Sequence, residues 1–194
     1  MISTEQVKEL RDKTGVSIMQ CRKALEEANG DIEKALLILK KKGADIAANK
    51  GSRTLGAGAI QSYIHANGTV GAIVELSSET DFVAKNEEFK KAAYDIAMHV
   101  AATNPEFLSM DDISAEAKTK AEEAFVHEVD GKPEEMKRKI LDGKLNSYFS
   151  ERVLLEQPFI KNPDVTIKEL VNSLIQKFGE KTEIRRFVRF STGD

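Results

Sequence analysis

Residues 80 to 85, with the sequence TDFVAK, place a carboxylate beside a large aromatic ring where the chain changes direction. A strand-like run precedes this corner and a helix-like run follows it. Asp81 can stabilise the positive N-terminal end of the following helix, and Phe82 would then be an ordinary core residue. The same two residues can instead form a rigid tip that pushes an apolar ring and a negative charge into another molecule. The residues at the corner leave both interpretations open.

Other patterns that would indicate chemistry are absent from the sequence. There is no phosphate-binding loop of the form GxxxxGK[ST] and no complete dinucleotide fingerprint. His65, His99 and His127 lack the neighbouring cysteines or carboxylates that are typical of a zinc site. Cys21 has no histidine close in sequence, so we interpret it as a structural thiol. We therefore expect no catalytic residues, no metal and no cofactor, and we do not expect an enzyme.

Composition limits the environment and the partners of the chain. It has 194 residues, of which 41% are apolar and 31% charged, with a net charge of −3 and a pI near 5.8. This balance is that of a globular protein, and it gives no overall reason to expect a nucleic-acid partner or an anionic membrane surface. No apolar run approaches the roughly 18 residues that span a bilayer. A single cysteine cannot form an intrachain disulfide, so a reducing, cytoplasmic location is expected.

The first 43 residues predict three short helices. Ser3 and Ser17 each begin a helix, and Asp31 caps a third that ends in three lysines and Gly43. Residues 44 to 57 are rich in alanine, glycine and basic residues, which is typical of a connector. We expect a three-helix module over residues 1 to 50 and a second domain over residues 51 to 194.

The remainder predicts a small sheet packed against helices. Two strands, residues 59 to 65 and 69 to 77, flank Asn67-Gly68, the sequence typical of a type I′ hairpin turn. The other expected elements are helices at 86–102, 114–128, 133–150 and 166–178 and a last strand at 183–190. The fold class is therefore α+β, with a three-stranded antiparallel sheet.

Both faces of this sheet are expected to carry apolar groups. Tyr63, Ile73 and Phe187 have the opposite parity to the residues assigned to the first face. Either helices cover both faces, or the second face joins two copies of the chain in a sheet-to-sheet dimer.

Several segments together resemble one family over essentially the whole chain. The N-terminal segments resemble the ubiquitin-associated-like module of elongation factor Ts, and TDFVAKN resembles that family's second signature. The matching segments are LRDKTG at 10–15, CRKAL at 21–25, NGD at 29–31, TDFVAKN at 80–86, MHVAA at 98–102 and LEQPF at 155–159. The length is similar to that of the short bacterial form, whose members are dimers that bind two partner molecules.

This resemblance implies guanine-nucleotide exchange on elongation factor Tu in translation elongation. It implies that a tip enters the GTPase near its magnesium site, while the N-terminal module and the core add further contacts. The residues implied are Thr80, Asp81, Phe82 and Val83 in the tip, Arg11, Ile18, Met19 and Arg22 in the N-terminal module, and His99 and Ile160 in the core. On this basis the ring of Phe82 should be substantially exposed. Contacts from Lys161 and from the arginines at 185, 186 and 189 stay open.

A different class of function also stays open. The three-helix module alone could bind ubiquitin-like folds or nascent chains, with the rest of the chain as a dimerising stalk. The resemblance favours exchange, with elongation factor Tu and a second copy of the chain as the partners and without direct nucleic-acid or membrane binding.

Overall fold

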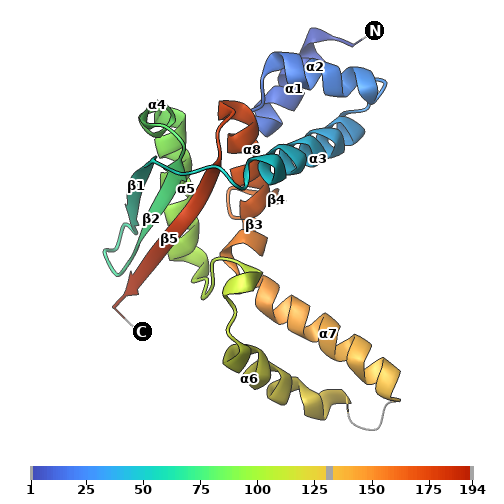
Figure 1. The fold of residues 1–194 in the computed structure, drawn as a ribbon, viewed down its shortest axis with the longest axis vertical. Helices are drawn as coiled ribbons and strands as arrows, with labels where there is room; N and C mark the ends of the chain where they lie inside the picture. The colour runs from blue at the N-terminus through green and yellow to red at the C-terminus, as the bar shows by residue number, and fades with distance from the viewer. Residues whose placement is uncertain (1, 130–132, 193–194) are drawn as a thin grey trace.

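A computed structural model describes residues 2–129 and 133–192 of the chain. Three helices at the N-terminus lead into a three-stranded antiparallel sheet that packs against helices, so the predicted α+β class is confirmed (Figure 1). A helical hairpin projects from the end of the molecule opposite the N-terminal helices (Figure 1).

The N-terminal helices begin and end where the sequence chemistry places caps. They are α1 (Thr4–Thr14), α2 (Ile18–Glu27) and α3 (Ile32–Lys50). The Ser3 and Gln6 side chains form a reciprocal capping box, and Gly15 ends α1 in the left-handed conformation at φ 68°. A small apolar core joins the three helices, with Leu10 and Leu25 fully buried.

Helix α3 differs from the prediction because it continues through Gly43 to Lys50. Gly43 lies inside the helix and faces α8 (Ile167–Phe178), where an added Cβ would lie 3.3 Å from the Gln176 side-chain oxygen. The glycine thus permits close approach of two helices where the sequence pattern indicated a helix end. Consequently the second half of α3 packs on the core, and Ile46 and Ala47 contact its apolar cluster.

The sheet has the strand order β1-β2-β5, with both neighbouring pairs antiparallel. Its strands are β1 (Ala57–Ile64), β2 (Val70–Ser78) and β5 (Thr182–Ser191). Helix α5 (Glu87–Thr103) lies across one face, and α8 completes the core beside it. Leu76 of β2 and Phe89 and Ile96 of α5 are fully buried in this core.

The hairpin turn is not the predicted type I′, which needs a positive φ at both central residues. Only Gly68 has one, at φ 72°, while Asn67 does not. The Asn67 side chain instead accepts hydrogen bonds from the Thr69 N–H and hydroxyl, at 3.1 and 2.9 Å. This local acceptor favours a longer turn closed by the Gly68 N–H donating to the His65 carbonyl.

The apolar second face exists, but its composition corrects the parity argument. Ile73 pairs with Ser62 on one side and Val188 on the other, so Tyr63 and Phe187 belong to the core face. Parity within one strand does not carry over to the next, because the register decides which residues lie opposite. The outer face exposes five apolar side chains: Ile60, Ile64, Ile73, Val188 and Phe190. Among the described residues no helix covers it, which removes the alternative of helices on both faces.

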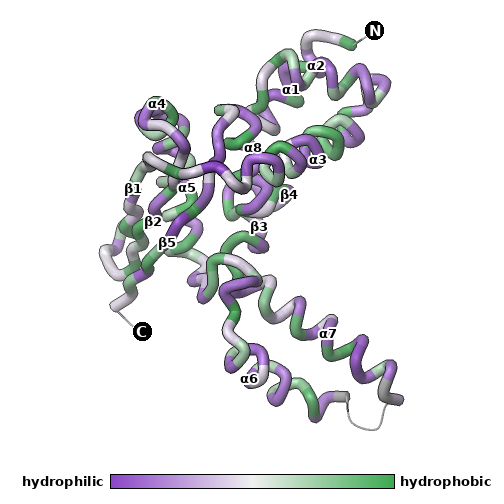
Figure 2. Tube along the Cα trace, viewed as in Figure 1, coloured by the Kyte–Doolittle hydropathy of each residue, from purple (hydrophilic) through white to green (hydrophobic). Residues whose placement is uncertain are grey.

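The projecting hairpin consists of α6 (Ala115–Val126) and α7 (Glu134–Ser150). Hydrophobic and hydrophilic residues alternate along both helices, as expected of helices that pack along one stripe each (Figure 2). Phe149 and Val153 form its buried base. The short elements are α4 (Asp81–Ala84), the 3-10 turns Met110–Asp112, His127–Val129 and Leu154–Glu156, and the two-stranded sheet of β3 (Pro158–Phe159) and β4 (Asn162–Thr166).

Candidate functional site

The TDFVAK corner folds as one turn of helix, α4, between the end of β2 and the start of α5. The Lys85 N–H donates to the Asp81 carbonyl at 3.0 Å, and the Asn86 side chain accepts from the Glu88 N–H at 2.8 Å to begin α5. Phe82 is 82% exposed, as the sequence predicted. Isolated exposed apolar residues are common, but a phenylalanine on a short turn with fixed ends is a candidate contact point for a partner.

Asp81 puts a negative charge beside this ring. Its carboxylate lies 2.5 Å from the Lys85 ammonium, and this hydrogen bond is the main cause that lowers the pKa of Asp81 below its ordinary value. Both side chains are largely exposed, so the ion pair contributes little to stability and can exchange partners. At neutral pH the tip therefore carries an ionised carboxylate that can exchange its exposed Lys85 partner for a donor of another molecule.

Two residues of the corner face inward. Val83 is only 3% exposed and Ala84 7%, and Val83 belongs to the main apolar core. Its side chain therefore anchors the tip in the core, and the expected contact of Val83 with a partner stays a prediction. Thr80 is exposed, and its N–H and hydroxyl both bind the Glu180 carboxylate.

The second group of expected residues lies on α1 and α2. Ile18 and Met19 open α2 after the Ser17 cap and are 58% and 67% exposed. Arg11 and Arg22 are also exposed, and Arg22 forms an ion pair with Glu26 at 3.2 Å. The N-terminal helices and α4 lie at the same end of the molecule (Figure 1). The fold thus places two exposed apolar points, each flanked by charge, on elements at the same end of the molecule.

The core pair shows a division of roles. Ile160 is 40% exposed, whereas His99 is fully buried, so the expected contact from the His99 side chain stays a prediction. Its Nδ1 accepts from the Ile160 N–H at 3.3 Å, and its Nε2 donates to the Gln157 side-chain oxygen at 2.9 Å. Burial lowers the pKa of His99, which favours the neutral ring. The neutral ring can accept a hydrogen bond from the Ile160 N–H and so holds the Ile160 backbone in place. Lys161 beside it is engaged with Asp95 at 2.7 Å.

Alternative sites for chemistry find little support in the described residues. No three His, Cys, Asp or Glu side chains converge there in a way that could hold a metal ion. Cys21 is buried, and burial raises the pKa of its thiol, which disfavours the nucleophilic thiolate. No helix in this part of the chain is long and apolar enough to cross a membrane.

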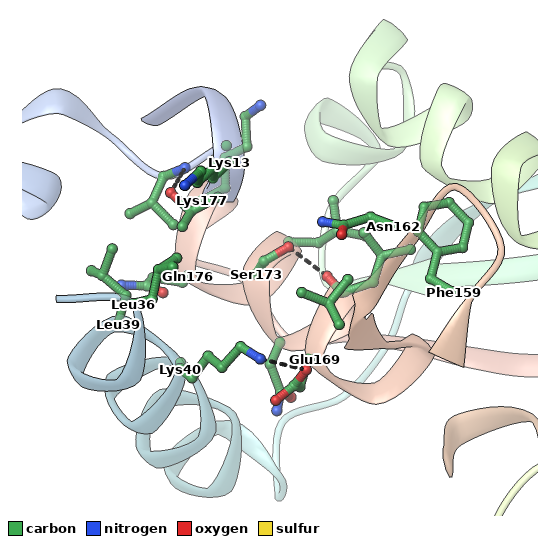
Figure 3. Close-up of a pocket in the computed structure, with 18 residues that line it drawn as sticks. Lys13, Leu36, Leu39, Lys40, Phe159, Asn162, Glu169, Ser173, Gln176 and Lys177 are labelled. Carbon is green, nitrogen blue, oxygen red and sulfur yellow. Dashed lines mark hydrogen bonds and ion pairs between the residues drawn. The ribbon is translucent and has the colours of Figure 1, made fainter. Parts of the chain in front are cut away.

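A cavity of about 320 Å³ lies between α3 and α8. Leucines of α3 and the side chains of α8 line it, and the Lys40 ammonium closes one side by an ion pair with Glu169 at 3.1 Å (Figure 3). Its lysines at 13, 40 and 177 all have carboxylate partners, so they leave no uncompensated charge for a ligand. The cavity marks the joint between the N-terminal helices and the core.

Comparison with known proteins decides the family. The sequence profile described as Elongation factor TS matches residues 23–194. The chain belongs to the elongation factor Ts family. Elongation factor Ts of Carboxydothermus hydrogenoformans is 48% identical over 196 residues, covering 100% of this chain and 90% of that protein. The proteins of the same name from Acetivibrio thermocellus and Syntrophus aciditrophicus are 47% and 49% identical, covering 100% of this chain and 91% and 97% of their own lengths.

For this member of the elongation factor Ts family, the structure also supplies site residues that the sequence did not indicate. Glu79 and Glu180 lie next to the tip, and each accepts a hydrogen bond from a residue of the other's loop: Glu79 from Lys181 and Glu180 from Thr80. Their partners are about 100 positions away, at sequence separations of 102 and 100 residues, so no local pattern identifies them.

Proposed function

We propose that this chain is the guanine-nucleotide exchange factor of elongation factor Tu in translation elongation. It binds the GDP form of the GTPase, disturbs the magnesium and phosphate site, and promotes GDP release so that GTP can bind. The observation that carries this proposal is the exposed Phe82 beside an ionised Asp81 on a fixed turn, in a chain of the elongation factor Ts family.

The mechanism is differential binding and makes no covalent bond. A factor accelerates release only if it holds the nucleotide-free GTPase more tightly than the nucleotide-bound form. The Phe82 ring can fill an apolar gap that opens when the magnesium site is disturbed. The Asp81 carboxylate adds a negative charge at a site where the charge of the metal ion was balanced by that of its ligands. Both contacts form only in the disturbed state, which is the condition for coupling.

The other surfaces orient the tip. Ile18 and Met19, flanked by Arg11 and Arg22, provide a second anchor on the GTPase, and Ile160 provides a third on the core. Val83 and His99 act beneath the surface, since each is buried and holds an exposed neighbour in place. In this scheme Thr80 fixes the base of the tip.

The outer face of the sheet is the interface between two copies of the chain. Five exposed apolar side chains on one flat face form the kind of patch that closed two-fold dimers bury. Translation elongation also places the protein in the cytoplasm, without direct binding to nucleic acid or membrane.

The experiment is release of a fluorescent GDP analogue from purified elongation factor Tu. We expect the protein to accelerate release catalytically, and excess GDP with magnesium to dissociate the complex, because linkage is reciprocal. Binding to the GTPase without acceleration would contradict exchange and would favour an adaptor role.

A further inference from the structure

The tip is tied to a distant loop by a reciprocal pair of carboxylates. The Glu180 carboxylate accepts from the Thr80 N–H at 3.0 Å and from the Thr80 hydroxyl at 2.6 Å. In the opposite direction, the Glu79 carboxylate accepts from the Lys181 N–H at 2.5 Å. Each loop thus uses one side chain to satisfy a backbone N–H of the other.

These bonds extend the sheet beyond its last backbone pair. The β2–β5 ladder ends at Ser78 opposite Thr182. The carboxylates continue it toward the tip, where the chain has left the strand geometry. Glu79 also binds Arg53 of the connector at 3.0 Å, and the Lys181 N–H is the main cause that lowers the pKa of Glu79. Glu79 is therefore fully occupied by the joint, and of the two carboxylates it is Glu180 that bonds to Thr80.

The same loop is connected to the N-terminal helices. Gly179 ends α8 in the left-handed conformation at φ 69°, and its carbonyl accepts from the Lys50 ammonium at 2.6 Å. Lys50 is the last residue of α3. A continuous path therefore runs from α3 through Gly179 and Glu180 to Thr80, two residues before Phe82.

We propose that Glu180 is a positioning residue for nucleotide exchange. Through its two bonds to Thr80 it sets the direction in which the Asp81–Phe82 tip projects, and it holds the tip in register with the N-terminal contact surface. This inference rests on the proposed exchange function and adds a residue that neither the tip nor the N-terminal surface contains. Because the tip must enter a site of fixed shape, a small change in its direction lowers the rate of the exchange step more than it lowers binding.

The test measures release of a fluorescent GDP analogue from elongation factor Tu at increasing concentrations of the factor. We expect Glu180→Ala to lower the maximal rate by about tenfold or more, with the half-saturating concentration nearly unchanged. Glu180→Gln retains an acceptor and a donor of the same reach and should recover most of the rate. Thr80→Val, which removes only the 2.6 Å bond, should fall between them. Glu123→Ala on α6 is the control for loss of an exposed carboxylate far from the tip.

A second measurement does not depend on exchange activity. Hydrogen exchange of the Thr80 amide should accelerate in Glu180→Ala, while amides inside β2 stay protected, because only the loop bond is lost. An unchanged maximal rate or an unchanged Thr80 amide in Glu180→Ala would overturn the positioning role, as would an equal loss in Glu180→Gln. If the wild-type protein itself fails to accelerate release, the proposed function fails instead, and the Thr80 amide still reports on the bond.

Discussion

Substitution of Phe82 by alanine tests the contribution of the tip separately from the stability of the rest of the protein. The ring is 82% exposed, so its loss removes almost no packing from the chain itself. Surface substitutions of this kind change the free energy of unfolding by less than about 0.5 kcal/mol. Helix content and thermal stability of Phe82→Ala should therefore match those of the wild type.

The expected effect on exchange follows from the exposed fraction. Complete burial of a phenylalanine is worth about 1.5–3 kcal/mol. With 82% of the residue available, docking can supply about 1.2–2.5 kcal/mol to the nucleotide-free complex. Since 1.36 kcal/mol corresponds to a factor of ten, release of GDP should slow by about eightfold to seventyfold.

The assay is stopped-flow release of a fluorescent GDP analogue from elongation factor Tu at saturating factor. Leu37→Ala is the matched control, because Leu37 is 65% exposed on α3 and lies outside the proposed contacts. Release at the wild-type rate in Phe82→Ala would refute the proposed role of the tip in nucleotide exchange. Loss of more than about 2 kcal/mol of folding stability would also refute the reasoning, since it would mean that the ring supports the fold.

Three further perturbations test other parts of the site. Asp81→Asn should slow release by about 13-fold to 160-fold, because a hydrogen bond to a charged group is worth about 1.5–3 kcal/mol and 1.36 kcal/mol corresponds to a factor of ten. Lys85→Ala should leave the rate of GDP release in the same assay unchanged, because the exposed ion pair contributes little. Below about pH 6.5 wild-type folding stability should fall, by at most about 1.4 kcal/mol per pH unit from His99, because the unfolded chain binds a proton that the buried, neutral ring refuses. Chemical denaturation of wild type and His99→Gln between pH 7 and 5.5 would show this, and equal slopes would contradict it. Ile73→Lys at the centre of the outer sheet face should reduce the mass measured by light scattering from twice 21.5 kDa to 21.5 kDa, whereas a wild-type monomer would rule out the dimer.

Local chemistry made most of the elements predictable. Ser3, Asn86 and Thr166 each accept a backbone hydrogen bond at the start of a helix, and residue types at caps are a short-range signal. The errors at Gly43 and on the outer sheet face arose where tertiary contact decided the outcome, whereas the error in turn type arose from the local Asn67 acceptor. Gly43 had the sequence context of a helix end, but α8 packs against it and the helix continues. The composition of the outer sheet face depended on the β2–β5 register, which no single strand contains.

The site residues also divide into those that the sequence could indicate and those that depend on tertiary contacts. Phe82, Ile18 and Met19 were predictable because the family resemblance marks them, and the structure places all three at the surface. Val83 and His99 belong to the same segments, yet they point inward, and sequence spacing on one short turn or one helix does not settle which residues face the core. Glu180 was not predictable, since the role we propose for it depends on a contact with Thr80 across 100 residues.

The tip and the N-terminal surface should contribute to different quantities. A shift from 1:99 to 99:1 between two states needs about 5.5 kcal/mol of differential binding. Phe82 can supply about 1.2–2.5 kcal/mol and Asp81 about 1.5–3 kcal/mol, so the tip approaches this value when both contacts are fully formed. In the proposed scheme Ile18 and Met19 contact the GTPase equally with and without nucleotide, so they should raise affinity without adding to the coupling. The free energy that the tip can supply barely reaches the value needed, so a misdirected tip would lose the exchange step while binding persists. For this reason the rigid support beneath Thr80 matters as much as the exposed residues above it.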